Sequence, residues 1–156
     1  MEYKFTKMTQ QEAEEIAYEW HYEGEYSFYD MEADQEDLAE FLDPVARGDS
    51  LFAVTSETGL IGFFSVNKTD TTTVDIGLGM HPNLTGKGNG LEFINSGLEF
   101  VQSTLAPKTI TLSVATFNQR AIKVYQKVGF VEEKTFLQET NGSTFEFLKM
   151  TYYCEA

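Results

Sequence analysis

The segment between residues 73 and 116 constrains the fold more than any other part of the sequence. Thr73–Met80 alternates apolar residues with small or polar ones, the period of a half-buried strand, and Thr109–Thr116 alternates in the same way. Between them, apolar residues recur at helical spacing over Gly90–Leu105, which predicts an amphipathic helix. A strand, a helix and a strand in succession predict a right-handed crossover that joins two parallel strands.

Further strands and helices are expected on both sides of this crossover. Thr9 and Glu12 form a capping box, which predicts a helix from Gln10 to about Tyr22. Asn141-Gly142 is a strong type I′ turn signal, so Val131–Tyr153 should form a hairpin with Phe136 opposite Phe147. The other expected elements are a strand over Tyr3–Met8, a helix from Asp34 or Gln35 to Leu42, a hairpin of Leu51–Thr55 with Leu60–Asn67, and a helix over Gln119–Val128. These elements predict one α+β domain over residues 1–156, with a mixed sheet.

The charge balance narrows the choice of partners. The chain has 156 residues and carries 11 Lys and Arg against 25 Asp and Glu, a formal net charge of −14. This balance argues against binding to nucleic acid or to an anionic membrane surface. Cys154 is the only cysteine, which excludes an internal disulfide and a CxxC zinc site and fits a reducing compartment. We expect a cytoplasmic protein without a metal centre, because the sequence shows no signal peptide and no apolar run of about 18–20 residues.

The loop between the first strand and the helix of the crossover is rich in glycine. Gly86, Gly88 and Gly90 alternate there, so that backbone N–H groups can converge on an anion at the positive end of the helix. The spacing fits neither a Walker loop nor the dinucleotide GxGxxG motif, and a glycine-rich helix start without a ligand explains it equally well. The later helix carries a stripe of positive residues, Arg120, Lys123 and Lys127. This stripe could attract a polyphosphate by its positive charge, although such a stripe is more often only a solvent-exposed helix face.

Two motifs together resemble the GNAT family of acetyl-CoA-dependent N-acetyltransferases. The first is Ile76-Gly77-Leu78-Gly79-Met80-His81-Pro82 followed by Thr85-Gly86-Lys87-Gly88-Asn89-Gly90. The second is the segment 118–130, an Asn followed by Ala, Tyr and Gly-Phe. The resemblance covers nearly the whole chain and implies a GNAT-like, mostly antiparallel sheet of about seven strands flanked by about four helices. Thr85 stands where the family usually has Gln or Arg.

The resemblance also implies how acetyl-CoA is bound. In the family, the pantetheine arm pairs with backbone where two parallel strands separate, and loop amides hold the diphosphate. Bare Gly77 and Gly79 agree with a close backbone approach, although a bulge would also explain them. Asn118 would contact the cofactor and can equally cap its helix. The implied cofactor-binding residues are Leu78, Gly79, Met80, Thr85, Gly86, Lys87, Gly88, Asn89, Gly90, Asn118, Lys123 and Lys127.

The resemblance gives one residue a catalytic role. Tyr125 occupies the family's position for the general acid that protonates the departing thiolate, and a phenol with a pKa of about 10 stays protonated at neutral pH. Tyr125 could also be a core residue, because it shares the apolar face of its helix with Ala121. No base is assigned: Val74 stands where some members carry Glu, and alternation turns Asp75 to the opposite face.

Aromatic and acidic residues are interleaved between residues 18 and 30, enough to attract a cation, although core packing would also explain the aromatics. In the family, the first two helices usually wall the acceptor pocket. The resemblance therefore implies transfer of an acetyl group to a primary amine, on a small molecule or a peptide, by direct attack in a ternary complex. The alternative is a non-catalytic acyl-CoA-binding module, and either would be a monomer or a homodimer. The expected acceptor residues are Trp20, Glu23, Glu25, Tyr26 and Tyr29.

Overall fold

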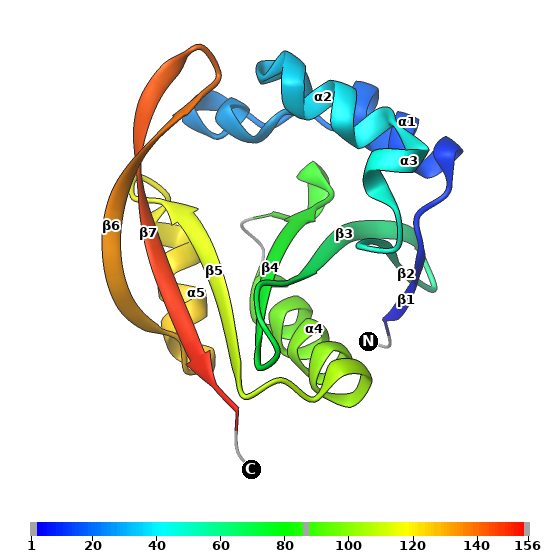
Figure 1. Ribbon diagram of the computed structural model, residues 1–156. Helices are drawn as coiled ribbons and strands as arrows, with labels where there is room; N and C mark the ends of the chain where they lie inside the picture. The colour runs from blue at the N-terminus through cyan, green and yellow to red at the C-terminus, as the bar shows by residue number, and fades with distance from the viewer. Residues whose placement is uncertain (1–2, 86–87, 155–156) are drawn as a thin grey trace.

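The computed structural model describes residues 3–85 and 88–154, and its main feature is a seven-stranded sheet (Figure 1). The strands run in the order β1-β2-β3-β4-β5-β7-β6. Every pairing is antiparallel except that of β4 with β5, which is parallel. The strands are β1 (Lys4–Lys7), β2 (Leu51–Ser56), β3 (Gly59–Lys68), β4 (Thr73–Met80), β5 (Thr109–Ala115), β6 (Val131–Thr140) and β7 (Ser143–Tyr153).

Helices cover both faces of the sheet. One core joins the sheet to the helices α4 and α5, with Phe64 and Phe93 fully buried in it. A second core on the opposite face joins α1 and α2 to Phe63 of β3. In Figure 1, α1, α2 and α3 lie together at the top, away from α4 and α5. The α-helices are α1 (Gln10–Glu19), α2 (Gln35–Leu42), α3 (Pro44–Arg47), α4 (Gly90–Leu105) and α5 (Gln119–Val128), and the 3₁₀ helices are η1 (Gly24–Tyr29), η2 (Met31–Ala33) and η3 (Pro82–Leu84).

The predicted α+β architecture with a parallel crossover is confirmed. The strand β4 and the helices α4 and α5 have the predicted bounds. Asn141 and Gly142 have φ of 53° and 75°, as a type I′ turn requires, and Phe136 lies opposite Phe147. The capping box of Thr9 and Glu12 is also present.

One helix end differs from the prediction, and one helix was not predicted. The helix α1 ends at Glu19 rather than near Tyr22, because Trp20 takes an extended conformation that puts its side chain, 3% exposed, in the second core. The helix α2 ends before Asp43-Pro44 as expected, but a further helix begins at these residues. The Asp43 carboxylate accepts from the backbone of Val45, and proline is well suited to the first position of a helix, so the short helix α3 follows at once.

Candidate active site

The parallel strands β4 and β5 separate after a short stretch of pairing. Their register covers only Thr73–Asp75 against Thr109–Thr111. Beyond it, β4 stays paired with β3 as far as Met80, and β5 stays paired with β7 as far as Ala115. Each strand is thus held by its outer neighbour while an opening widens between them.

The register turns backbone groups of both strands into this opening. His81 N donates to Ile61 O at 2.8 Å, so Met80, the preceding residue, points its own N–H and C=O away from β3 and towards β5. The backbone N–H and C=O of Leu78, two residues earlier, point in the same direction. On the other strand, Thr116 N donates to Glu146 O at 3.0 Å, so the N–H of Ala115 points towards β4. The opening is therefore edged by strand backbone on both sides.

A cleft of about 700 Å³ occupies this opening. It brings together residues from the segment after α1, the strands β4 and β5, the helices α4 and α5 and the hairpin of β6 and β7. Among the predicted site residues, the cleft is lined by Leu78, Gly79, Met80, Thr85, Gly88, Gly90, Asn118, Tyr125, Lys127, Tyr26 and Tyr29.

Other predicted site residues lie elsewhere. Trp20 packs in the second core, with its ring centroid 5.0 Å from that of His81. Glu23 and Glu25 are exposed near η1, and neither they nor Lys123 and Asn89 are among the described residues that line the cleft. The predicted residues Gly86 and Lys87 lie outside the described residues.

The bare glycines of β4 have a packing explanation. The pairing of β3 with β4 shows no register shift, so no bulge is present there. A Cβ on Gly79 would lie 2.4 Å from the Phe63 ring, and a Cβ on Gly77 would lie 2.6 Å from Ser65 Oγ. The close neighbours that exclude a side chain at these positions are therefore side chains of β3.

The start of the glycine loop is braced by its own side chains. Thr85 Oγ1 donates to Pro82 O at 2.9 Å, and Asn89 Nδ2 donates to Leu84 O at 3.1 Å. Gly88 has φ of +81° with open space around it, a conformation that favours glycine. The loop thus leads into the N-terminus of α4, where the partial positive charge of the helix meets the cleft.

The helix α5 supplies a second wall of the cleft. Asn118 caps it by accepting from Ala121 N at 3.2 Å, as the sequence suggested. Lys127 of the positive stripe lines the cleft, as does Arg120, whose guanidinium carbon lies 4.2 Å from the centroid of the Tyr26 ring. The stripe is therefore divided between the cleft and solvent, with Lys123 on the exposed side.

Tyr125 lies on the cleft-facing side of α5 and is partly buried. Its ring packs against Phe130 with centroids 5.9 Å apart. Burial raises the pKa of the Tyr125 phenol, and the nearby Tyr29 adds to the shift, so the group is protonated at neutral pH. One side of the Tyr125 ring thus packs in the core, and the other side is accessible from the cleft.

The side of the cleft next to the segment after α1 holds Asp30 of the aromatic and acidic run, together with two residues outside the expected acceptor set. Tyr22, Asp30 and Asp37 all line it. Burial, together with the charge of Asp34 and other neighbouring acids, raises the pKa of Asp37. Hydrogen bonding to Asp30 raises the pKa of His21, whose Nδ1 lies 3.2 Å from the Asp30 carboxylate. An acidic wall thus faces the opening between the strands.

Asp75 lies at the base of the opening, on the opposite face from Val74, as expected. Its carboxylate accepts from Thr111 Oγ1 at 2.7 Å, and burial raises its pKa. Among the described residues, Asp75 is not part of the cleft lining. The structure therefore gives no reason to assign it as the base.

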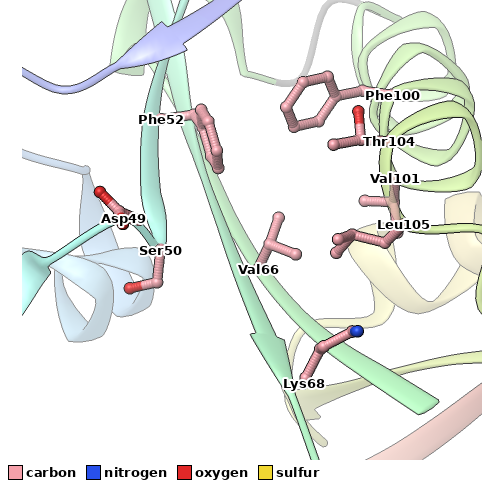
Figure 2. Close-up of a pocket in the computed structure, with 9 residues that line it drawn as sticks. All are labelled: Asp49, Ser50, Phe52, Val66, Lys68, Phe100, Val101, Thr104 and Leu105. Carbon is pink, nitrogen blue, oxygen red and sulfur yellow. The ribbon is translucent and has the colours of Figure 1, made fainter. Parts of the chain in front are cut away.

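A second hollow of about 420 Å³ lies between β2, β3 and α4 (Figure 2). Phe52 and Phe100 meet there with ring centroids 4.9 Å apart. None of the predicted site residues that the structure describes lines this hollow, so the cleft between β4 and β5 is the candidate site.

Within residues 3–85 and 88–154, no group of three or more His, Cys, Asp or Glu side chains is placed to hold a metal ion. No helix in the same part of the chain is long and apolar enough to cross a membrane.

Comparisons with known proteins bear on this site. The sequence matches the acetyltransferase (GNAT) domain family over residues 4–131. Spermidine N-acetyltransferase from Vibrio cholerae in complex with CoA and spermine is similar in structure, with a TM-score of 0.74 and 20% identity over 97% of this chain and 95% of that chain. A putative phosphinothricin N-acetyltransferase is also similar in structure, with a TM-score of 0.72 and 14% identity over 99% of this chain and 100% of that chain. No curated protein sequence matches this chain. Because the family match spans most of the sequence, the chain belongs to the GNAT family of acetyltransferases.

Proposed function

We propose that this protein transfers the acetyl group of acetyl-CoA to a primary amine, by direct attack in a ternary complex formed in the cleft. The observation that carries the proposal is the separation of β4 from β5, which leaves strand backbone facing a cleft lined by Tyr125. An amide-bearing arm can pair with such an edge as an added strand does. The pantetheine arm of acetyl-CoA has this character.

The cofactor would be held by two sets of groups. The backbone of Leu78 and Met80, together with Gly79, would face the pantetheine arm. The loop amides and the N-terminus of α4 would hold the diphosphate, because converging N–H groups and the helix dipole favour an anion. The residues proposed for the diphosphate end are Thr85, Gly86, Lys87, Gly88, Asn89 and Gly90. Lys123 and Lys127 would add positive charge there, and Asn118 would contact the cofactor.

Acetyl transfer needs a polarised thioester and a proton for the leaving group. The N–H of Met80 points into the opening, where it can donate to the carbonyl oxygen as negative charge develops. The neutral amine attacks the carbonyl carbon, the C–S bond breaks, and Tyr125 donates its proton to the CoA thiolate. The ammonium form of the acceptor loses one proton to solvent before the attack, and its nitrogen loses a second after it, since no carboxylate is assigned as the base. Tyr125 regains its proton from solvent.

The acceptor should carry positive charge. Asp30 and Asp37 line the acceptor side of the cleft together with the rings of Tyr22 and Tyr26. Carboxylates and aromatic faces both attract an ammonium group. The Vibrio cholerae enzyme of similar fold binds spermine together with CoA. A small polyamine is therefore the acceptor that we propose for the first test.

The experiment measures release of free CoA thiol from acetyl-CoA with spermidine, with a peptide bearing a free N-terminus, and without an amine. We expect thiol release that depends on an amine, together with a stabilised fold in acetyl-CoA. Ligand at 100 times its dissociation constant adds about 2.7 kcal/mol to the free energy of unfolding. Stabilisation without thiol release would favour the non-catalytic acyl-CoA-binding module, and neither effect would refute both functions.

A further inference from the structure

The segment that follows α1 is hydrogen-bonded on both sides of the opening. On one side, Tyr22 Oη donates a hydrogen bond of 2.6 Å to Met80 O, a carbonyl that β4 turns into the opening. A carbonyl oxygen has two lone pairs, so this bond leaves one of them for a bound ligand. Tyr22 thus ties the start of the segment to β4.

On the other side, Tyr29 ties the end of the segment to the start of α5. Tyr29 Oη accepts from Asn118 Nδ2 at 3.1 Å. Asn118 caps α5 and follows the last residue of β5 after two residues. One phenol therefore binds β4, and the other binds the residue that leads from β5 into α5.

Several contacts stiffen the segment between these two phenols. Tyr22 N donates to the Asp30 carboxylate at 2.8 Å, which closes the segment on itself. Asn141 Nδ2 donates to Phe28 O at 2.9 Å, which joins it to the hairpin of β6 and β7. The segment spans the opening as one body, and we call residues 22–30 the aromatic strap.

We propose that Tyr22 and Tyr29 are positioning residues, which fasten the aromatic strap on both sides of the opening and so fix the acceptor amine against the thioester. The inference rests on the proposed function, because Asp30 and Tyr26 on the strap line the acceptor side of the cleft. Both ends must be held to keep this wall in place. Releasing either end therefore frees the same body.

The kinetic test replaces each phenol by the ring without its hydroxyl. We expect Tyr22→Phe and Tyr29→Phe each to raise the acceptor KM about tenfold, the size of one lost hydrogen bond. The kcat and the dissociation constant of acetyl-CoA should stay within about twofold, because the strap acts on the acceptor. The double variant should be close to either single one, since both bonds hold one body. Tyr18→Phe, at a 52% exposed position of α1 outside the cleft lining, is the matched control.

A second measurement does not depend on activity. Backbone hydrogen exchange over residues 22–30, in the protein without ligands, should be faster in Tyr22→Phe and in Tyr29→Phe than in the wild type or Tyr18→Phe. Unchanged exchange would overturn the fastening, even if the protein proved not to be an acetyltransferase. A fall in kcat with unchanged acceptor KM, or a KM about a hundredfold higher in the double variant, would overturn the positioning role.

Discussion

Asn118 joins the helix α5 to the aromatic strap, and its two functions can be separated by substitution. Its Oδ1 accepts from Ala121 N at 3.2 Å, which caps the helix. Its Nδ2 donates to Tyr29 Oη at 3.1 Å. Alanine removes both bonds, whereas serine keeps a capping oxygen but is too short to reach Tyr29.

The expected magnitudes follow from these two bonds. Loss of a helix cap costs about 1 kcal/mol, and loss of a neutral hydrogen bond costs about 1 kcal/mol more. Asn118→Ala should therefore lower the free energy of unfolding by about 2 kcal/mol, and Asn118→Ser by about 1 kcal/mol. For a chain of this size, each kcal/mol lowers Tm by about 2–4 °C.

Urea denaturation at neutral pH measures both differences. Thr9→Ala is the matched control, because Thr9 caps α1 through a similar bond without a second partner across the cleft. We expect Thr9→Ala to cost about 1 kcal/mol, the same as the difference between Asn118→Ala and Asn118→Ser, because each of these two quantities measures a lost cap. An unfolding free energy of Asn118→Ser equal to that of the wild type would show that the bond to Tyr29 adds nothing to stability, and would refute the reasoning.

Three further changes test the site and its surroundings. Tyr125→Phe should lower kcat at least about tenfold with nearly unchanged acetyl-CoA affinity, because only the proton donor is lost; equal turnover would remove Tyr125 from the mechanism. Gly88→Val should weaken acetyl-CoA binding measured by calorimetry, since a branched side chain obstructs the loop backbone. The control Gly59→Val, which is strained at φ of +111° in the distant hairpin, should leave the binding unchanged. Equal affinities of the two variants for acetyl-CoA would place the diphosphate elsewhere. His21→Gln should lower the free energy of unfolding more at about pH 5.5 than at about pH 8.5, because Asp30 raises the pKa of folded His21 above its unfolded value. The stabilisation by His21 is therefore present below about pH 6.5 and is lost as the pH rises through the raised pKa. Denaturation at both pH values checks this, and a loss of stability independent of pH would contradict it.

Local sequence patterns predicted the elements that carry the site. The alternation in Thr73–Met80 and the helical spacing in Gly90–Leu105 fixed their type and bounds, because one face of each is buried. The turn at Asn141-Gly142 also set the register of the last hairpin. These features depend on neighbours in the sequence.

The side of the cleft proposed to bind the acceptor depends on contacts that no local pattern contains. Tyr22 and Met80 are 58 residues apart, so their hydrogen bond could not be read from either segment. Asp37 has the appearance of an ordinary acid in the first turn of a helix. Trp20 stands in an aromatic and acidic run typical of a cation site, yet its neighbours in space are Phe63 and His81. The glycines of β4 likewise needed the register with β3 to be explained.

The central claim is that the pantetheine arm of acetyl-CoA pairs with β4 where β5 has separated from it. A crystal structure of the protein with CoA tests this claim most directly. We expect the arm to hydrogen-bond the backbone of Leu78 and Met80, with the sulfur near the Tyr125 phenol. CoA bound in another part of the molecule, or an arm that makes no bond to β4, would contradict the claim.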